Sequence, residues 1–225
     1  MFPAPPHVRF VEPAPYAYAD EGALDRDRLE LRMLRAKGRP EIRLALRPAR
    51  SSDGDLLQSY VQGLSPQSRY NRFLGAVSEL SASELVRALA ANGRDTLTLI
   101  LTSTDKNRET VVGEARAALS CAERAGEFAM SIADGWQGLG VGSALIEEIE
   151  RQAAADGIEW LFGDVLRTNE AMIALARGRG FRLGAGLEGR LVRIQKRLDA
   201  APDLPCQKWA AIGAGAERRA ASAGR

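Results

Sequence analysis

The chain has 225 residues, with 31 lysines and arginines, 29 aspartates and glutamates, and 45% hydrophobic residues. The net charge of +2 provides no overall field for nucleic acid, and no apolar run reaches the ~18 residues of a membrane helix, so neither is expected as a partner. The single histidine, His7, and two distant cysteines exclude histidine-based triads and a zinc site, so no metal is expected. The first residues, MFPAPPHVRF, lack the apolar core of a signal peptide, which predicts a cytoplasmic protein.

Composition divides the chain into three regions. Residues 1–40 form a proline-rich extension, in which residues 24–37 place three leucines near one helical face. This spacing predicts a short amphipathic helix, packed either on the domain or on a second copy in a homodimer. Residues 41–198 carry regular patterns and form the one folded domain. Residues 199–225 are rich in alanine and glycine and are expected to be a flexible tail.

Within the domain, hydrophobic periodicity and turn residues predict the elements in chain order. A strand over 42–46 is followed by helices around 53–61 and 81–89, and strands over 96–102, 110–119 and 127–133 come next. A helix beginning at Val141, a strand over 159–166, a helix over 170–180 and two final strands ending with 191–198 complete the domain. This order predicts a mixed α/β fold built on one sheet.

A glycine-rich turn joins the strand over 127–133 to the helix that follows it. Its residues are Gln137, Gly138, Leu139, Gly140, Val141, Gly142 and Ser143. A helix N-terminus carries free N–H groups and partial positive charge, and glycines let an anion approach that backbone, so a phosphate site made of main chain is predicted. A purely structural tight turn is the alternative. No Lys-Ser/Thr pair follows the glycines, which excludes a P-loop, and their spacing disfavours a dinucleotide fold.

The turn fits the Q/R-x-x-G-x-G/A signature of the GNAT superfamily of N-acetyltransferases, and other segments extend the likeness. They are LRP near the first strand, LSPQSRYNRF at 64–73, VVGEAR at 111–116, EFAMSIADGWQGLGVG at 127–142 and NEAMIALARGRGF at 169–181. The set resembles the acetyltransferase domain of bacterial Pat-type protein lysine acetyltransferases. The resemblance implies a mostly antiparallel central sheet flanked by helices, with acetyl-CoA as co-substrate and its pyrophosphate in the turn at 137–143. The fused domains of the large Pat enzymes have no counterpart here.

Transfer to an amine needs a base, because a lysine-like amine has a pKa near ~10.4 and is mostly protonated at neutral pH. The resemblance implies that Glu127, the first residue of the strand before the turn, is this base. Glu114 is the second candidate; it could face the acceptor groove or simply pair with Arg116. Either carboxylate could act through water. The superfamily polarises the thioester carbonyl with a main-chain N–H, which by position belongs to Ile132 or Ala133.

The segment over residues 169–181 carries further expected contacts. Asn169 matches an asparagine that reaches the pantetheine arm in the family, and a plain helix N-cap is an equal alternative. Residues 166–198 hold eight basic residues against two acidic ones, and Arg177 and Arg179 are the expected contacts to CoA phosphates. Many members have a tyrosine as proton donor for the leaving thiolate, but the matching position here is Ala176. Tyr60, Tyr70 and Ser143 are formal substitutes.

The sequence therefore predicts an acetyl-CoA-dependent N-acetyltransferase that passes the acetyl group directly to a primary amine, on a protein lysine or a small molecule. A catalytically silent acyl-CoA-binding or regulatory module is the alternative, favoured by the missing tyrosine. The acceptor, the oligomeric state and the roles of the two terminal extensions are not encoded in these motifs.

Overall fold

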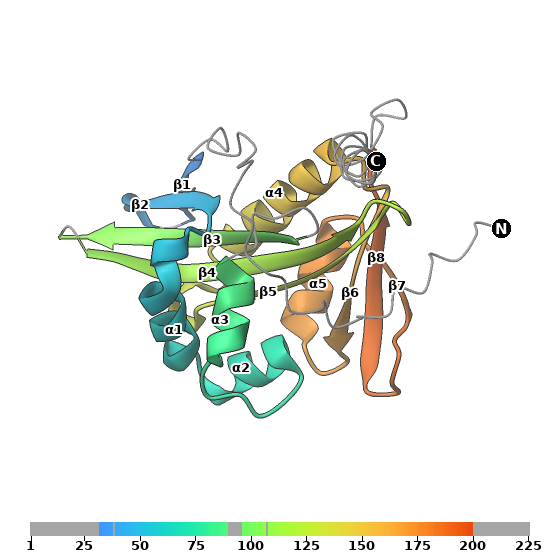
Figure 1. The fold of residues 1–225 in the computed structure, drawn as a ribbon, viewed down its shortest axis with the longest axis horizontal. Coiled ribbons are helices and arrows are strands. Elements are labelled where there is room, and N and C mark those ends of the chain that lie inside the picture. Colours follow the sequence, from blue (N-terminus) through green and yellow to red (C-terminus); the bar gives the residue numbers. More distant parts are fainter. Residues whose placement is uncertain (1–31, 38, 90–95, 107, 200–225) are drawn as a thin grey trace, which may run out of the picture.

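The computed structural model describes residues 32–37, 39–89, 96–106 and 108–199. Its centre is an eight-stranded sheet in the order β1-β2-β3-β4-β5-β6-β8-β7, in which only the β5–β6 pair is parallel (Figure 1). The strands are β1 (Arg32–Ala36), β2 (Arg39–Pro48), β3 (Thr96–Asp105), β4 (Arg108–Ser120), β5 (Ala125–Ile132), β6 (Trp160–Leu166), β7 (Arg182–Ala185) and β8 (Leu191–Arg197). The expected mixed α/β fold with a mostly antiparallel sheet is confirmed.

Helices cover both faces of this sheet. They are α1 (Gly54–Gly63), α2 (Pro66–Phe73), α3 (Ala82–Leu89), α4 (Val141–Ala155) and α5 (Glu170–Gly178), with short 3-10 turns η2 (Ser51–Asp53) and η3 (Asp134–Trp136). In Figure 1, α4 lies on one side of the sheet and α1, α2 and α3 lie on the other. Residues of α4 and α5 share one apolar core with the sheet, and residues of α1 and α3 form a second core. None of the helices in the described ranges is long and apolar enough to cross a membrane.

The N-terminal part of the sheet corrects one prediction. Residues 32–36, expected to close a helix over 24–37, instead form β1 and pair antiparallel with β2. Residues 24–31 lie outside the described ranges. Helix propensity is a weak bias over so few residues, and pairing with the neighbouring strand satisfies the same backbone groups. The sheet therefore starts before residue 41, where the domain was expected to begin.

The parallel pair β5–β6 positions the site, because the two strands touch over a short stretch and then separate. Pairing runs only from Ala125 opposite Trp160 to Glu127 opposite Phe162. Gly163 comes next, and a Cβ there would lie 2.6 Å from the main-chain oxygen of Phe128, so glycine alone permits this close approach. Beyond this point β5 and β6 are no longer paired.

Candidate active site

A groove of about 460 Å³ lies at the carboxyl end of β5, between the N-termini of α4 and α5 and the side of α2. It is lined by Ser65, Gln67, Ser68, Asn71, Arg72, Met130, Ser131, Ile132, Asp134, Trp136, Gln137, Gly138, Gly140, Val141, Gly142, Ser143, Asn169, Ala171, Met172 and Leu175. We call it the cofactor groove. Most residues of the predicted phosphate turn line it, and Asn169 is brought to its opposite side.

The turn has the backbone geometry that its glycines allow. Gly138 has φ 73° and Gly140 has φ 81°, both in the left-handed region that disfavours side chains. Gly140 is the N-cap of α4, and the N–H groups of Ser143 and Ala144 donate back to its carbonyl. The amides at Gly140, Val141 and Gly142 precede the helical ladder, so they are the free donors at the rim of the groove. Such a cluster of N–H groups favours an anion.

The two predicted main-chain donors of β5 differ. The Ala133 N–H donates to the carbonyl of Val112 on β4, at 2.9 Å, so Ala133 is already engaged. Because amides alternate direction along an antiparallel strand, the Ile132 N–H points away from β4, into the gap beside β6. The Ile132 carbonyl faces the same way and accepts from the Gln137 side chain at 3.1 Å. Of the two candidates, only Ile132 is placed to bind a ligand in the gap.

Polar contacts join the turn to the start of α2. The Asp134 carboxylate accepts hydrogen bonds from the Ser65 N–H (2.9 Å), the Ser65 hydroxyl (2.8 Å) and the Ser68 hydroxyl (2.7 Å). These three donors lower the pKa of Asp134, against an opposing effect of its partial burial. Gln137 donates to the Ser68 hydroxyl at 3.3 Å. The S-P-x-S and Q-x-x-G-x-G motifs are thus fastened to each other, and the side chain of Gln137 braces the loop.

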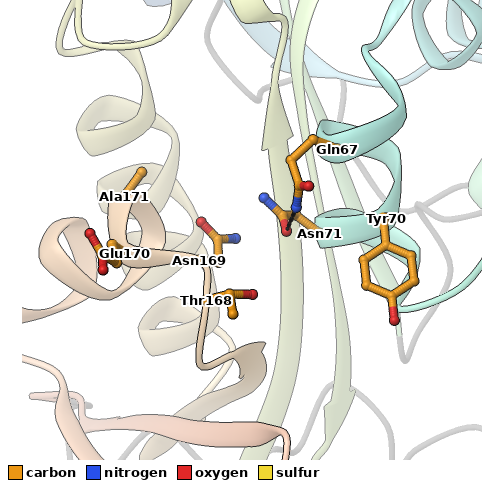
Figure 2. Close-up of a pocket in the computed structure, with 7 residues that line it drawn as sticks. All are labelled: Gln67, Tyr70, Asn71, Thr168, Asn169, Glu170 and Ala171. Atoms are coloured by element: carbon orange, nitrogen blue, oxygen red, sulfur yellow. Dashed lines mark hydrogen bonds between the residues drawn. The ribbon is translucent and has the colours of Figure 1, made fainter.

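Asn169 caps α5, and its side-chain oxygen accepts from the Met172 N–H at 3.2 Å. A second cavity, of about 500 Å³, lies beside it, and Figure 2 shows Asn169 and Thr168 facing Gln67 and Asn71 of α2 across this space. The cap leaves the amide nitrogen of Asn169 free to donate into the groove. The predicted helix cap is present, and it does not prevent a ligand contact.

The structure does not bring the two arginines that follow in the sequence to the groove. Arg177 is exposed in the last turn of α5, at the opposite end of the helix from Asn169. Arg179 pairs with Glu150 of α4 at 3.1 Å and with Glu147 at 3.5 Å. The basic excess counted over residues 166–198 is therefore spread over helix ends and strand faces.

Glu114, the second candidate base, is a buried and paired carboxylate. It is completely buried and pairs with Arg72 of α2 at 2.5 Å and with Arg116 at 2.8 Å. Burial raises its pKa, but the two guanidinium groups outweigh burial and bring the pKa to about 2. Burial and the two ion pairs favour a structural role over that of a base. The pairing with Arg116, left open by the sequence, is found, and Arg72 adds a bond that locks α2 to the sheet.

Glu127 lies on the same face of β5 as Ala129 and Ser131, opposite the face that carries Phe128 into the α4 core. It is half-buried. Burial raises its pKa, the charge of Asp164 adds to this, and Arg193 partly opposes both. A raised pKa suits a general base, but Glu127 is not among the residues that line the cofactor groove.

The candidate proton donors for the leaving thiolate are either bound to other side chains or lack a partner suited to proton donation. The Tyr60 hydroxyl is buried and lies 2.9 Å from the Ser131 hydroxyl, and burial raises its pKa strongly. The Tyr70 hydroxyl accepts from Arg190 at 3.1 Å. Ser143 lines the groove, and Ala176 is wholly buried in the α4 core. Within the described residues, no cluster of three or more histidine, cysteine, aspartate or glutamate side chains could hold a metal ion.

Sequence reasoning missed three contributors. Asp134 was not singled out, although it lies three residues before the motif glutamine. Asp164 and its partner Arg193 were also not linked to Glu127. The available signal was a lone charged residue in the otherwise apolar strand WLFGDVL, which must be paired if it is buried.

Known proteins share this architecture. The family model described as the acetyltransferase (GNAT) family matches residues 70–181. The acetyltransferase PA5475 of Pseudomonas aeruginosa is 29% identical over 136 residues, which are 60% of this chain and 73% of that protein.

Two solved structures illustrate the likeness in fold. The GNAT domain of Streptomyces lividans PAT is 24% identical with a TM-score of 0.67, covering 75% of this chain and 97% of that one. The protein yncA of Salmonella typhimurium, solved with acetyl-CoA, is 19% identical with a TM-score of 0.56, covering 72% and 98%. With the fold and the glycine turn described above, the match to the family model shows that the chain belongs to the GNAT superfamily of acetyltransferases.

Proposed function

We propose that the protein binds acetyl-CoA in the cofactor groove and passes the acetyl group directly to a primary amine. The observation that carries this proposal is the row of main-chain donors at Gly140, Val141 and Gly142, set on left-handed glycine geometry at the edge of a groove of about 460 Å³. A diphosphate matches these donors in charge and number. The acetyl-CoA in yncA and the Pat-type resemblance of the sequence agree with this assignment.

The proposed reaction uses few groups of the chain. The amides of the turn hold the pyrophosphate, and the Ile132 N–H donates to the thioester oxygen as negative charge develops there. Glu127 takes a proton from the acceptor ammonium, directly or through a water molecule. The amine nitrogen then forms a bond to the carbonyl carbon while the carbon–sulfur bond breaks. The acylated nitrogen loses its second proton to solvent and becomes the amide, and the thiolate of CoA leaves and takes a proton from water.

Calorimetric titration of the intact chain with acetyl-CoA tests the binding half of the proposal. We expect saturable binding with one site, and CoA should compete for it. ATP should compete much less well, because it lacks the pantetheine arm that fills the gap beside Ile132. An absence of acetyl-CoA binding would overturn the proposal.

The chemical half is tested with Glu127→Gln. Binding of acetyl-CoA should persist, because Glu127 does not line the groove, and CoA release should fall by about 10²-fold, the usual contribution of a positioned base. The acceptors to compare are a lysine peptide, spermidine, a free amino acid and an aminoglycoside. Glu123→Gln is the matched control, since Glu123 is exposed in the turn before β5. Unchanged turnover would assign deprotonation to water.

A catalytically silent acyl-CoA-binding module is the second candidate. It is favoured by Ala176, which is wholly buried at the position where many GNAT enzymes have a proton-donating tyrosine. Binding of acetyl-CoA without release of CoA for any acceptor in the panel would support this candidate.

A further inference from the structure

Asp164 and Arg193 form an ion pair beside Glu127. Asp164 lies on β6 directly opposite Arg193 of β8. Its two carboxylate oxygens accept from the guanidinium at 3.1 Å and 2.6 Å, so both oxygens are held. The guanidinium also stacks 4.6 Å above the ring of Phe162. The Asp164 and Arg193 side chains are only 7% and 12% exposed, so the pair is fixed and poorly screened by solvent.

The sheet register brings this pair to the proposed base. Glu127 is opposite Phe162 in the parallel ladder, and Asp164 follows Phe162 by two residues on the same face of β6. Two carboxylates and one guanidinium therefore share one face at the point where β5 and β6 separate. On the neighbouring strand β4, Ala118 is opposite Glu127. Arg116, two residues before Ala118 and on the same face of β4, is bound to Glu114. The described charged groups facing Glu127 are thus Asp164, Arg193 and Arg116, and Arg116 shares its partner Glu114 with Arg72.

We propose that Asp164, held in place by Arg193, is a positioning residue that acts through Glu127 and selects acceptors which arrive as primary ammonium ions. This inference rests on the proposed function. A fixed negative charge beside Glu127 favours its protonated form, so the carboxylate is readier to keep a proton taken from the amine. Glu127, Asp164 and Arg193 together carry a net charge of −1, which attracts an alkylammonium and repels an anionic acceptor, while Arg116 and Arg72 share Glu114 on the β4 side.

The charges make opposite predictions for two substitutions that break the same ion pair. Asp164→Asn leaves Arg193 unopposed, so the titration midpoint of Glu127 should fall. Arg193→Gln leaves Asp164 unopposed, so that midpoint should rise. Each change should be on the order of 0.5–1 pH unit, the size expected for one nearby charge in a partly buried site. If the ion pair only held β6 and β8 together, the titration midpoint of Glu127 would stay unchanged, or it would change in the same direction in both variants.

The measurement is a pH titration of carboxyl-labelled glutamate by carbon-13 NMR on the full chain, with the Glu127 signal assigned from Glu127→Gln. It needs neither acetyl-CoA nor an acceptor. Arg193→Lys keeps the cation and should leave the midpoint close to that of the wild type. Asp55→Asn, an equal change of charge at an exposed site of α1, should also leave it unchanged. Equal or parallel shifts for Asp164→Asn and Arg193→Gln would overturn the inference, whichever variant is the less stable.

A kinetic arm then tests selectivity with spermidine as the cationic acceptor. For Asp164→Asn the KM for spermidine should rise several-fold while the KM for acetyl-CoA stays constant. The acidic limb of the rate profile should also move to lower pH, as the titration does. An unchanged KM for spermidine would overturn the selectivity. Failure of the wild type to bind acetyl-CoA would instead overturn the proposed function and leave the NMR result standing.

Discussion

The cofactor groove and the charged face beside Glu127 are built by different means. The groove takes its donors from main chain at Gly140, Val141 and Gly142, and the side chains around it are neutral, apart from Arg72 and Asp134, which are bound to other residues. The charged face depends on side chains from four strands, paired as Glu114 with Arg116 and Asp164 with Arg193. The first site is set by local backbone conformation, and the second by the alignment of strands far apart in the sequence.

This difference predicts how each site fails. Main-chain donors tolerate changes in neighbouring side chains and are lost only when the backbone itself is forced elsewhere. A buried ion pair destabilises the fold when one partner is removed, because the charge of the other partner is then left uncompensated. Substitutions on the charged face should therefore cost stability first, and substitutions in the turn should cost binding first.

The largest effect is expected for Glu114→Gln. Removing the charge leaves Arg72 and Arg116 facing a neutral amide in a fully buried place, which should lower the free energy of unfolding by about 3–5 kcal/mol. Chemical denaturation at neutral pH measures this loss. Glu79→Gln is the control, since Glu79 is exposed and makes a single contact with Gln62 at 3.2 Å. A loss no larger than that of the control would show that the buried pairs add nothing to stability.

The same residue predicts a pH dependence. The pKa of Glu114 is lowered from 4.5 to about 2 on folding, so its contribution to stability is fully present above pH 4.5. It is lost as the pH falls toward about 2, because the unfolded chain takes up the proton first. Wild-type stability should drop across this window more steeply than that of Glu114→Gln, and parallel curves would contradict the assignment.

The next prediction concerns binding. Gly140→Val places a β-branched side chain at φ 81°, where such residues are strained, and the loop should leave its conformation. Affinity for acetyl-CoA should fall by about 100-fold, or roughly 2.8 kcal/mol, in calorimetric titration. Gly135→Val is the matched control, because Gly135 lies five residues away in η3 at an ordinary φ with open space around its Cβ position. Equal losses in both variants would remove the special role of Gly140.

The same contrast explains what the sequence could predict. The fold and the glycine turn before α4 were predicted correctly because they depend on local patterns, such as the glycine spacing and the alternation in β3 and β4, whereas phosphate binding by the turn stays a prediction. Asp164 stands out as a lone charge in an apolar strand, but only the β5–β6 register shows that it lies beside Glu127. Backbone direction is equally invisible, so Ile132 and Ala133 could not be separated before the ladder was known. For β1, tertiary pairing overrode a helical spacing of leucines.

A further prediction tests the contact that joins α2 to the glycine turn within the cofactor groove. Asp134→Asn weakens the bonds from Ser65 and Ser68 that fasten α2 to the turn. Because Asp134 is exposed, the cost in unfolding free energy should be only about 1 kcal/mol. Affinity for acetyl-CoA should nevertheless fall about 5-fold, since the brace formed by Ser68 and Gln137 is loosened. Asp105→Asn, at the exposed end of β3, is the control. If Asp134→Asn binds acetyl-CoA as tightly as the wild type, the turn keeps its conformation without the bonds to α2.

The smallest effect separates the two roles of Asn169. Serine is as good an N-cap as asparagine, but its shorter side chain ends in a hydroxyl and has no amide group to donate into the groove. Asn169→Ser should therefore keep the stability of the wild type within a few tenths of a kcal/mol, whereas Asn169→Ala loses the bond to the Met172 N–H and about 1 kcal/mol. Acetyl-CoA affinity should fall 2- to 5-fold in both variants, as about 0.5–1 kcal/mol of one hydrogen bond is lost. If Asn169→Ser binds acetyl-CoA as tightly as the wild type, the residue is a cap alone, and the pantetheine arm is held by the main chain of β5.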